Sequence, residues 1–460
     1  MSSYTFHKKP QHVPFVNTRH RTIQSPIPAP GTEIFLEELA ACESKSMQGQ
    51  LPIIWDKAKD VYIFDHLGNK WIDFTSTIFV ANIGHANNHL ISSVKSVLNN
   101  SLVHTYAYPN KIRLEYLKLL MQFAGNNFEK GFLLSSGTEA TEVVLKLMRV
   151  NGQASKKRRL GVICLEGNWH GRTMGAQLMS SNLEQKQWIS HRDLDVHHLP
   201  FPYPWVVEEN NAEKFLYESL TSLKKNNIDL EKDICGIMME TFQGWGAVFY
   251  PSVYVKAIEK ICREYNILLA FDEMQAGFGR TGEKFGYEHY GVQPDLICCG
   301  KGMGGGFPLS GVLGKSEVMD LPGFGNMSST HSANPISCAA GLATIQEIES
   351  KDLVRESFLK GQLLSKGLQA IQKINPDRIS YVLGKGLLAA ILFRDPHTGE
   401  PDNLFPSKVA EICMQMGLLV VHTGREAIKI GPPLTITEDC LQEGIDVIEE
   451  AIQQAICQEK

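Results

Sequence analysis

The chain has 460 residues, of which 43% are hydrophobic and 21% are charged, an ordinary balance for a globular protein. A formal net charge of −5 and the lack of a long uncharged apolar run argue against a nucleic-acid-binding protein and against a membrane-spanning one. The ten cysteines form no CxxC pair, so we expect neither a metal centre nor a disulfide framework. Together with an amino terminus, MSSYTFHKKP, that has no apolar signal segment, this predicts a cytoplasmic protein.

The first 75 residues predict an arm that is followed by a helix and a hairpin. Residues 1–30 are rich in proline, histidine and arginine, and we expect an extended arm without a core of its own. Residues 33–41 predict the first helix. Two apolar segments then flank DHLGN at 65–69, a turn sequence that is typical of a hairpin.

From residue 89 onward the chain predicts helices and then a strand–loop–helix rhythm. Helical spacing of apolar residues marks 89–98 and 114–123. The expected strands are 131–134, 160–165, 234–240, 267–272 and 296–300, with helices at 139–150 and 253–265. Such alternation predicts a mostly parallel α/β sheet, in which ligands bind at the carboxyl ends of the strands.

The pattern changes after Pro335. Long helices are expected at 337–348 and 354–374, strand-containing segments at 379–393 and 418–430, and a last helix that Thr437 can cap. We expect these elements to form a smaller α+β subdomain with the amino-terminal segment. The predicted parts are therefore the arm (1–30), the first part of the small subdomain (31–75), a large α/β domain (76–340) and the rest of the small subdomain (341–460).

One lysine stands out at the end of a predicted strand, in LICCGKGMGGGFP at 296–308. Lys301 follows an apolar run and is surrounded by glycines, so a flat ligand could approach the backbone. Desolvation would lower the pKa of such a lysine and make its amine nucleophilic, as a Schiff base to an aldehyde requires. The alternative is an ordinary lysine in a flexible surface loop.

Two further segments follow predicted strands. Asp272 ends LLAFD, where a carboxylate could keep a pyridine nitrogen protonated across a shared cofactor, or could simply cap a loop. Ser136, Gly137 and Thr138 precede or begin a helix, whose free N–H groups and hydroxyls could hold a phosphate. The same three residues would equally serve as an ordinary helix cap.

A loop with the sequence GNWHGRT follows the strand at 160–165. Trp169, beside His170, could stack on a heteroaromatic ring, and Arg172 could bind a substrate carboxylate through two parallel hydrogen bonds. A core tryptophan and a surface ion pair are the plain alternatives. GFGRTG at 277–282 matches the dinucleotide-binding pattern GxGxxG, but no apolar helix follows it, so a nicotinamide-dependent dehydrogenase is not favoured.

Several sequence blocks occur in a fixed order along the chain. They are WIDFTSTIFVANIGH, SSGTEATEVVLK, WHGRT, METFQGWGA, LLAFDEMQAGFGRTG, DLICCGKGMGGGFPLSG, THSANPISCAA and IKIGPPLTIT. In this order and spacing the chain resembles the class III pyridoxal-phosphate-dependent aminotransferases over most of residues 32–455. The resemblance implies the large pyridoxal-phosphate fold of the aspartate aminotransferase type (fold type I), with a mostly parallel central sheet and a second subdomain from both chain ends.

The resemblance also implies roles for the residues of a cofactor site. Lys301 would bind pyridoxal 5'-phosphate covalently and then transfer a proton, and Asp272 would pair with the pyridine nitrogen. Gln275 would contact the ring hydroxyl, and Trp169 would stack on the ring, where the family more often has Tyr or Phe. The other cofactor contacts are assigned to Ser136, Gly137, Thr138 and His170, and to Thr330 from a partner subunit, because such an active site lies at a homodimer interface.

Five residues are assigned to the substrate: Ile78, Arg172, Glu240, Trp245 and Lys429. In the 4-aminobutyrate and ornithine branches of the family, a gate glutamate stands where this chain has Trp245. Its arginine partner stands where this chain has Lys429, so both halves of the gate have changed. Arg172 is kept, which favours a substrate or acceptor with a carboxylate. Ile78 favours a 4-aminobutyrate-like or other ω-amino substrate, because the ornithine branch has Tyr at this position.

The resulting hypothesis is a cytosolic, homodimeric transaminase that moves a terminal amino group from an amine donor to a 2-oxo acid by a ping-pong mechanism. Trp245 would also suit a bulkier amine, such as an amino sugar or a diamine. Two further alternatives are another pyridoxal-phosphate reaction on the same fold, such as an aminomutase or a decarboxylating transamination, and a non-catalytic cofactor-binding protein. The sequence implies no metal, nucleic-acid or membrane partner.

Overall fold

The computed structural model describes residues 4–190 and 195–459. The chain forms two compact units, and each of them combines separate stretches of sequence. Unit 1 consists of Met1–Asn87, Trp245–Ala247 and Arg355–Lys460, and unit 2 consists of Asn88–Gly244 and Val248–Val354. The unit boundaries after residues 87 and 354 fall beyond the limits at 75 and 340 that are predicted from the sequence for the large domain.

Unit 2 is built around a seven-stranded sheet whose order is β6-β14-β13-β12-β9-β7-β8. Strand β14 pairs antiparallel with β13 and β6, whereas the pairs β13–β12, β12–β9, β9–β7 and β7–β8 are parallel. The strands are β6 (Lys130–Leu134), β7 (Gly161–Leu165), β8 (Val196–Leu199), β9 (Ile234–Glu240), β12 (Leu268–Asp272), β13 (Leu296–Cys299) and β14 (Ser310–Gly314). The predicted mostly parallel α/β sheet is confirmed.

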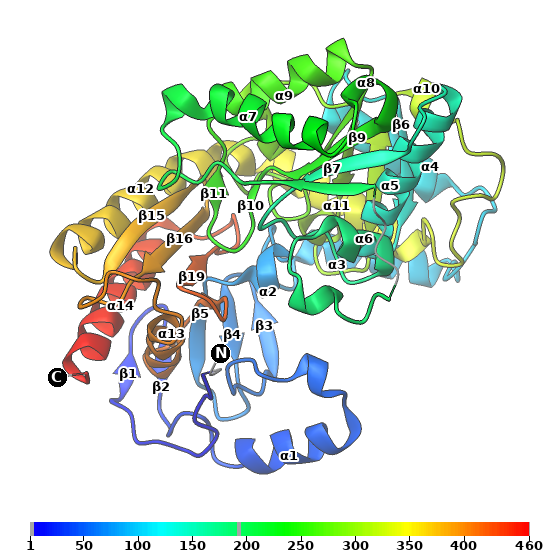
Figure 1. The fold of residues 1–460 in the computed structure, drawn as a ribbon. Coiled ribbons are helices and arrows are strands. Elements are labelled where there is room, and N and C mark those ends of the chain that lie inside the picture. The colour runs from blue at the N-terminus through cyan, green and yellow to red at the C-terminus, as the bar shows by residue number, and fades with distance from the viewer. Residues whose placement is uncertain (1–3, 191–194, 460) are drawn as a thin grey trace. The chain divides into compact units, whose positions relative to one another are not determined.

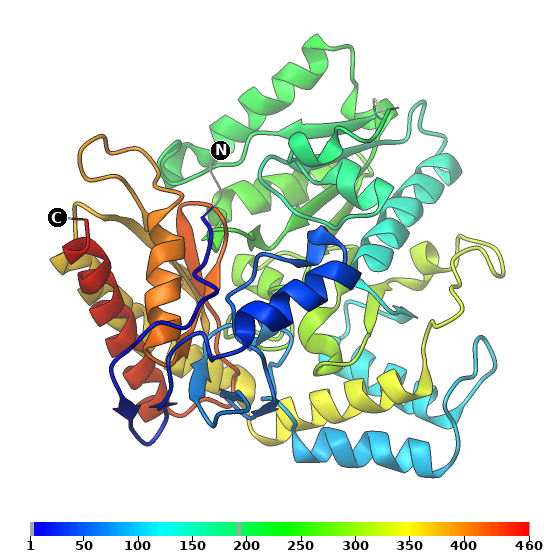
Figure 2. The ribbon, with the colours of Figure 1, turned by 90° about the horizontal axis from the view of Figure 1, so that it is seen from below.

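Helices cover both faces of this sheet, with α7 and α9 on one side and α5 on the other (Figure 1). Every residue of β7, β9, β12 and β13 is consequently buried, as is usual for parallel strands. The helices of unit 2 are α3 (Asn88–Asn99), α4 (Lys111–Ala124), α5 (Gly137–Ala154), α6 (Met174–Met179), α7 (Ala212–Lys225), α8 (Leu230–Asp233), α9 (Ser252–Glu264), α10 (Ser316–Met319) and α11 (Pro335–Ser350). Figure 2 shows α11, in yellow, beside the light-blue α3.

The main core of unit 2 lies between α5 and the sheet. Val144, Leu147 and Met148 of α5 pack against strand residues that include Val162 and Met238. Burying one such side chain contributes about 1.5–3 kcal/mol, so this contact fixes α5 firmly on the strands. As a result, the first turn of α5 is held at the carboxyl edge of the sheet, directly after β6.

Unit 1 contains two sheets. One has the order β1-β2-β5-β4-β3, with β17 pairing in parallel with β5, and the other is antiparallel with the order β15-β16-β19-β18. The strands are β1 (Val16–Asn17), β2 (Thr22–Ile23), β3 (Lys57–Lys59), β4 (Tyr62–Phe64), β5 (Lys70–Asp73), β15 (Ile379–Lys385), β16 (Leu388–Phe393), β17 (Leu418–Leu419), β18 (Val421–His422) and β19 (Ala427–Ile430). The hairpin predicted around DHLGN is confirmed by the antiparallel pairing of β4 with β5.

The helical elements of unit 1 are α1 (Thr32–Cys42), the turn α2 (Ser76–Phe79), α12 (Leu353–Ile374), α13 (Phe405–Gln415) and α14 (Glu438–Cys457). Helix α12 begins just before the boundary of the unit. Thr437 is the N-cap of α14 as predicted, but its hydroxyl makes no capping hydrogen bond to the helix. The first two residues of the helix, Glu438 and Asp439, supply the negative charge that favours a helix N-terminus instead.

The amino-terminal arm is bound to the last two helices of unit 1 by a hydrogen bond and an ion pair. The Tyr4 hydroxyl donates to the Glu411 carboxylate of α13 at 2.5 Å. Nε of Arg21 lies 2.6 Å from Oε1 of Glu443 in α14. Further along the arm, Ile23 and Ile27 join a buried cluster with Trp71 of β5. The arm is therefore an integral part of unit 1.

The turn α2 has an unusual backbone. Ser76, Thr77, Ile78 and Phe79 all have positive φ angles, between 46° and 66°, so they form a left-handed turn without any glycine. Each such residue costs roughly 1–2 kcal/mol, which the surroundings must offset. The Ser76 hydroxyl donates to the carbonyl of Gly431 at 2.7 Å, and Phe79 is buried against the same glycine. These contacts hold the turn in a fixed place within unit 1.

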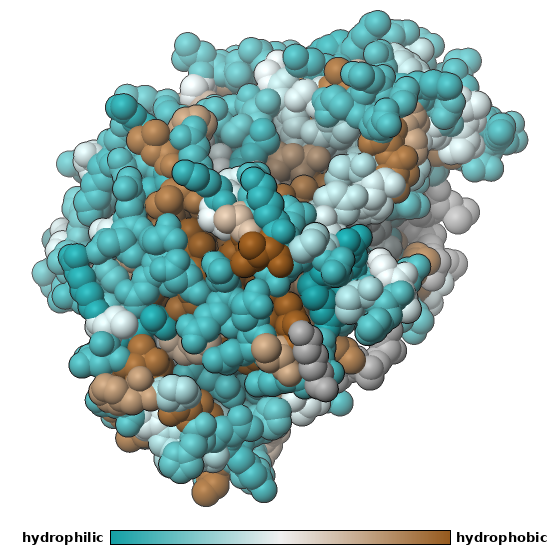
Figure 3. Space-filling model, turned by 90° about the vertical axis from the view of Figure 1, so that its left-hand side faces the viewer, coloured by the Kyte–Doolittle hydropathy of each residue, from teal (hydrophilic) through white to brown (hydrophobic). Residues whose placement is uncertain are grey.

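The surface agrees with the modest net charge of the chain. The face drawn in Figure 3 is mostly hydrophilic, and its hydrophobic residues lie in small separate groups. Among residues 4–190 and 195–459, no helix is both long enough and apolar enough to cross a membrane.

Candidate active site

The residues predicted for the cofactor site gather at the carboxyl ends of the parallel strands of unit 2. Asp272 is the last residue of β12 and pairs in register with Glu240, the last residue of β9. Lys301 follows the end of β13, and the loop with Trp169 and His170 follows β7. Because these four strands are parallel neighbours, their ends meet at one edge of the sheet, where such sheets bind ligands.

Lys301 is the first residue of a short 3-10 turn (Lys301–Gly304) after β13. Its φ of 43° lies in the left-handed region, a strain of about 1–3 kcal/mol that is typical of functional sites. Burial lowers the pKa of the Lys301 amine below the ordinary lysine value, while the charges of Asp272 and Glu240 act in the opposite direction. More of the amine is therefore neutral and nucleophilic at neutral pH than in an exposed lysine.

Glycines allow the backbone to pack tightly around this lysine. A Cβ on Gly300 would lie 2.6 Å from Sδ of Met274, and a Cβ on Gly137 would lie 2.8 Å from the same sulfur. Real Cβ atoms do not come this close, so both positions need glycine while Met274 keeps its place. Met274 thus packs between the start of α5 and the backbone before Lys301, a contact that the sequence did not reveal.

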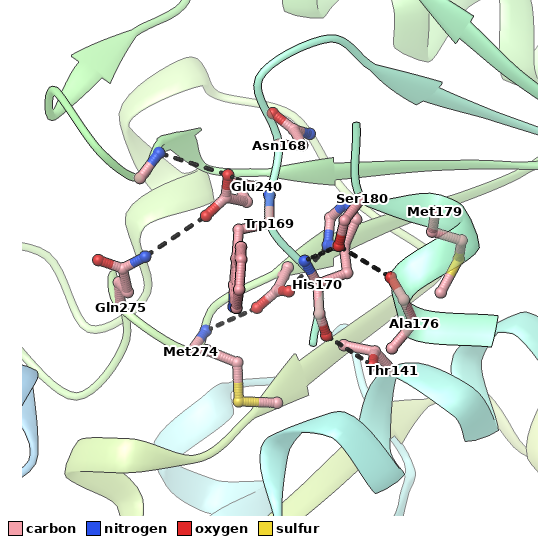
Figure 4. A network of polar contacts seen from close by, with 12 residues as sticks. Thr141, Asn168, Trp169, His170, Ala176, Met179, Ser180, Glu240, Met274 and Gln275 are labelled. Atoms are coloured by element: carbon pink, nitrogen blue, oxygen red, sulfur yellow. Dashed lines mark hydrogen bonds and ion pairs between the residues drawn. The ribbon is translucent and has the colours of Figure 1, made fainter. Parts of the chain in front are cut away.

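A buried histidine supports Asp272. Nδ1 of His170 lies 2.9 Å from Oδ2 of Asp272, and the backbone N–H of Met274 donates to Oδ1 of the same carboxylate at 3.0 Å. His170 is itself held at both ends of its backbone, because its N–H donates to the Ser180 hydroxyl and its carbonyl accepts from Thr141 (Figure 4). Both Asp272 oxygens therefore have fixed partners, and the carboxylate has a defined orientation.

Glu240 organises the opposite side of the site (Figure 4). Its Oε2 accepts the backbone N–H of Trp169 at 3.0 Å and that of Gly244 at 3.3 Å, and its Oε1 accepts from the Gln275 amide at 3.4 Å. One buried carboxylate thus positions the predicted stacking residue, the predicted ring-hydroxyl contact and the backbone of Gly244. Glu240 is predicted from the sequence as a substrate residue, and no sequence signal indicates these contacts.

The start of α5 is the phosphate site that the sequence predicts. Ser136 is the N-cap and forms a capping box with Glu139, whose carboxylate accepts the Ser136 N–H at 2.8 Å. Within the part of the chain that the structure describes, the N–H groups of Gly137 and Thr138 donate to no acceptor. Together with the Thr138 hydroxyl, which lies 2.6 Å from that of Thr173, they can receive a phosphate at the positive end of the helix.

Arg172 lies over the indole ring of Trp169, with 4.6 Å between the guanidinium carbon and the ring centre. The arginine is exposed and, among the described residues, forms no ion pair, whereas Trp169 is half-buried. Neither plain alternative, a core tryptophan or a surface ion pair, describes these two residues. The stack holds the planar guanidinium of Arg172, a hydrogen-bond donor, at the edge of the site.

The other predicted substrate residues belong to unit 1. Ile78 stands on the left-handed turn and is 43% exposed. Lys429 of β19 is buried, with Nζ 4.8 Å from the ring centre of Phe79. The guanidinium carbon of Arg425 lies 3.9 Å from the ring centre of Trp245. No sequence motif had indicated a role for Arg425.

The role predicted for Thr330 depends on a second subunit. It is exposed, in the segment of unit 2 between α10 and α11. Its expected contact with a cofactor phosphate requires a partner subunit, so it is not tested by a single chain.

Unit 2 offers a matching group to each reactive part of pyridoxal phosphate. The amine of Lys301 suits the aldehyde, the carboxylate of Asp272 suits the protonated pyridine nitrogen, and the unused N–H groups at the start of α5 suit the phosphate. No cluster of His, Cys, Asp and Glu suited to a metal ion occurs among residues 4–190 and 195–459. The fold and this set of groups define a pyridoxal-phosphate-dependent enzyme of fold type I.

Comparison with known proteins gives the family. The sequence profile described as aminotransferase class-III matches residues 44–452. The chain is 30% identical over 441 residues to the 4-aminobutyrate aminotransferase of Mycobacterium leprae, covering 93% of this chain and 97% of that protein. It is 33% identical over 411 residues to a leucine/methionine racemase of Thermococcus litoralis, covering 87% and 90%. This chain belongs to the class III aminotransferases, which are pyridoxal-phosphate-dependent enzymes, and it catalyses transamination.

Solved structures support the fold. A transaminase from the marine bacterium Virgibacillus superposes with a TM-score of 0.84 at 24% sequence identity, over 93% of this chain and 99% of that one. At this level of identity the likeness concerns the fold alone, and it confirms the predicted fold type I architecture.

Proposed function

We propose that this enzyme moves a terminal amino group from a 4-aminobutyrate-like ω-amino donor to a 2-oxo acid by a ping-pong mechanism. The observation that carries this proposal is the strand-end set in which Lys301, with a lowered pKa, shares one edge with the buried pair Asp272 and His170. The choice of donor is supported by Ile78 and by the likeness to a 4-aminobutyrate aminotransferase.

Each residue of the site would have a defined task. When bound, the cofactor supplies an electron sink for the substrate carbon that carries the amine. Lys301 takes the proton from that carbon and returns it, while Asp272 keeps the pyridine nitrogen protonated. Gly137 and Thr138 would hold the phosphate through their N–H groups, and Trp169 would stack on the ring. Gln275, positioned by Glu240, would contact the ring hydroxyl.

Arg172 would bind a carboxylate of the amine donor or of the oxo acid. The Trp169 ring occupies the face of its guanidinium and leaves the N–H donors at the edge available. This is the geometry that a planar carboxylate needs. It favours donors and acceptors that carry an acid group.

The assembly and the location of the enzyme are part of the proposal. We infer a homodimer in which Thr330 of one chain reaches the phosphate site of the other. The exposed side chains of Tyr108 and Phe324, in the same unit as Thr330, would find a cover in such an interface. A cytosolic location agrees with ten cysteines that form no disulfide, eight of them buried as small apolar side chains.

The test is a panel of amines added to the cofactor-loaded enzyme without an acceptor. The panel contains 4-aminobutyrate, ornithine, β-alanine, taurine, diamines and amino sugars, and loss of the visible absorbance of the bound cofactor marks a productive donor. We expect 4-aminobutyrate or a close ω-amino acid to bleach it, and Lys301→Ala to bind the cofactor but not to respond. If no amine changes the spectrum of the loaded enzyme, a non-catalytic cofactor-binding protein replaces this proposal.

Product analysis separates transamination from the other reactions of this chemistry. A transaminase releases an aldehyde or oxo acid in the first half-reaction and needs a 2-oxo acid to recover its absorbance. Release of CO2 would indicate decarboxylating transamination, and a rearranged amine would indicate an aminomutase. Loss of optical activity with no oxo product would indicate racemisation, the reaction for which one relative is named.

A further inference from the structure

Thr173 links the loop with the sequence GNWHGRT to the start of α5. Its hydroxyl oxygen lies 2.6 Å from that of Thr138, and its backbone N–H donates to the Thr138 hydroxyl oxygen at 3.3 Å. Gly171 makes this approach possible, because a Cβ at that position would collide with the Thr138 side chain. All three residues belong to unit 2, so the contact lies within one compact unit.

Thr173 is the N-cap of α6, but its hydroxyl does not cap that helix. An N-cap threonine ordinarily accepts the N–H of the second or third helical residue. Here these two N–H groups, from Gly175 and Ala176, donate to Oε1 of Glu142 at 2.8 Å and 3.2 Å. Glu142 stands about one turn after Thr138 in α5, so it caps α6 from the neighbouring helix. The Thr173 hydroxyl is thereby left available for its contact with Thr138.

The two hydroxyls together leave one O–H group unused. A hydroxyl has one O–H donor and two acceptor lone pairs, and two hydroxyls bonded to each other use one O–H between them. In the part of the chain that the structure describes, neither the Thr138 nor the Thr173 hydroxyl has any other acceptor. Thr138 is half-buried and Thr173 is exposed, so the remaining O–H can point outward. It belongs to the same group of donors as the unused N–H groups of Gly137 and Thr138.

We propose that Thr173 is a positioning residue of the phosphate site, and that Glu142 permits this role by capping α6 in its place. This inference rests on the proposed function, which assigns the cofactor phosphate to the start of α5. Thr173 holds the Thr138 hydroxyl in an orientation that lets the pair donate an O–H to a phosphate oxygen. The same contact ties the loop that carries Trp169 to the phosphate site.

The direct experiment compares the binding of pyridoxal phosphate and of pyridoxal, which lacks the phosphate, to the full-length apoenzyme by calorimetry. Thr173→Val keeps the shape of the side chain and removes the hydroxyl. It should weaken the binding of pyridoxal phosphate roughly tenfold and change the binding of pyridoxal much less, because a hydrogen bond to a charged group is lost. Thr173→Ser keeps the hydroxyl and should recover most of the loss. Thr221→Val is the matched control, since this threonine of unit 2 bonds only to a carbonyl of its own helix.

Variants of Glu142 test the second part of the inference. Glu142→Leu removes the acceptor of both N–H groups, so the Thr173 hydroxyl can return to capping α6 and leave Thr138. The ratio of the two affinities should then fall about as far as in Thr173→Val, and in the double variant it should fall little further. Glu142→Gln keeps a carbonyl oxygen that can accept both N–H groups, and it should retain most of the wild-type ratio. A general loss of stability would weaken both ligands alike and leave the ratio unchanged.

The outcomes separate this inference from the proposed function. A ratio of affinities in Thr173→Val that equals the wild-type ratio would overturn the inference. Thr138→Val removes the hydroxyl that the proposed function itself assigns to the phosphate. If Thr138→Val weakens pyridoxal phosphate and Thr173→Val does not, only the role of Thr173 is wrong. If Thr138→Val also leaves pyridoxal phosphate binding unchanged, the phosphate does not bind through this hydroxyl, and that part of the proposed function is overturned as well.

Discussion

Nδ1 of His170 lies 2.9 Å from Oδ2 of Asp272, and both side chains are almost completely buried. A carboxylate in such surroundings is costly unless donors satisfy it, and a hydrogen bond to a charged group contributes about 1.5–3 kcal/mol. The histidine comes from the loop after β7, two strands away from Asp272 at the end of β12. The pair therefore couples the position of the WHGRT loop to the carboxylate that we propose as the partner of the pyridine nitrogen.

The first prediction concerns this pair. His170→Leu should remove one donor to Asp272, lower cofactor affinity and slow the first half-reaction by roughly 10- to 100-fold, because about 1.4 kcal/mol corresponds to a factor of ten. His170→Asn is the matched control, since its amide can occupy the place of Nδ1 and should recover much of the loss. Cofactor dissociation and single-turnover bleaching measure the two effects. Equal behaviour of the two variants would show that the hydrogen bond to Asp272 is unimportant.

The second prediction concerns the pH at which Lys301 becomes reactive. Burial lowers the pKa of its amine, so in the apoenzyme the neutral form should increase through a midpoint below the ordinary lysine value of about 10.4. The negative charge of Glu240 raises this pKa, so Glu240→Gln should move the midpoint to still lower pH. Acylation of Lys301 as a function of pH, followed by mass spectrometry, reports the midpoint directly. A midpoint equal to that of surface lysines in the same sample would contradict the desolvation argument.

The third prediction concerns the packing of Met274 against two glycines. Gly300→Ala should destabilise the enzyme by about 1–3 kcal/mol and weaken cofactor binding, because the new Cβ meets the sulfur of Met274. In a Met274→Ala background the same substitution should cost clearly less. A double-mutant cycle on the unfolding free energy gives the coupling. If the losses of unfolding free energy caused by the two substitutions are strictly additive, Gly300→Ala does not act through a clash with Met274.

The fourth prediction concerns Glu273, the buried neighbour of Asp272. Burial raises its pKa to about 7, although it accepts hydrogen bonds from Thr241, Gly286 and Tyr287. The native state then binds a proton more tightly than the unfolded chain, so this residue should reduce the stability as pH rises from about 4.5 to about 7. The total change is on the order of 3 kcal/mol.

Glu273→Gln is the variant that tests this expectation. It cannot lose a proton, so its unfolding free energy should decrease less than that of the wild type between pH 5 and pH 8. Parallel curves for the two proteins, obtained by denaturant unfolding at each pH, would contradict a raised pKa for Glu273.

The fifth prediction concerns the amino-terminal arm. Arg21 is largely buried, with Nε 2.6 Å from Glu443 and Nη1 2.7 Å from the carbonyl of Met416. Arg21→Ala should therefore lower the unfolding free energy by about 1.5–3 kcal/mol. Arg19→Ala is the control: its ion pair with Asp439 is exposed, and exposed pairs contribute little. Denaturant midpoints measured for both variants compare the two contacts.

Much of the architecture could be predicted because the buried strands of unit 2 are continuous apolar runs. Strands β9, β12 and β13 appeared at the expected positions for this reason. Strand β14 was missed: its sequence, SGVLG, has glycine at two of five positions and few β-forming residues. It is buried between β6 and β13, where neighbouring strands, and not its own composition, determine the conformation.

Candidate site residues could be predicted where a charged side chain ends or follows an apolar strand, as at Asp272 and Lys301. Contacts made across the fold were not predictable, because spacing in the sequence says nothing about them. The stack of Arg425 on Trp245 joins residues that are far apart in the sequence. The left-handed turn at 76–79 contains no glycine that would have indicated it. Glu240 ends an apolar strand, but only the structure shows that it accepts three hydrogen bonds.

The pairing of β5 with β17 has a consequence for biosynthesis. The indole N–H of Trp71 donates to the carbonyl of Met414 at 2.7 Å, a contact that spans 343 residues, and Ile72 pairs with Leu418. The sheet at the beginning of the chain therefore stays incomplete until β17, near the end of the chain, has left the ribosome. Trp71 and Phe74 remain available to chaperones, or to aggregation, throughout synthesis. Both stretches of unit 2 end before residue 355, so unit 2 can fold first, and the cofactor site can form before the unit that carries Arg425 is complete.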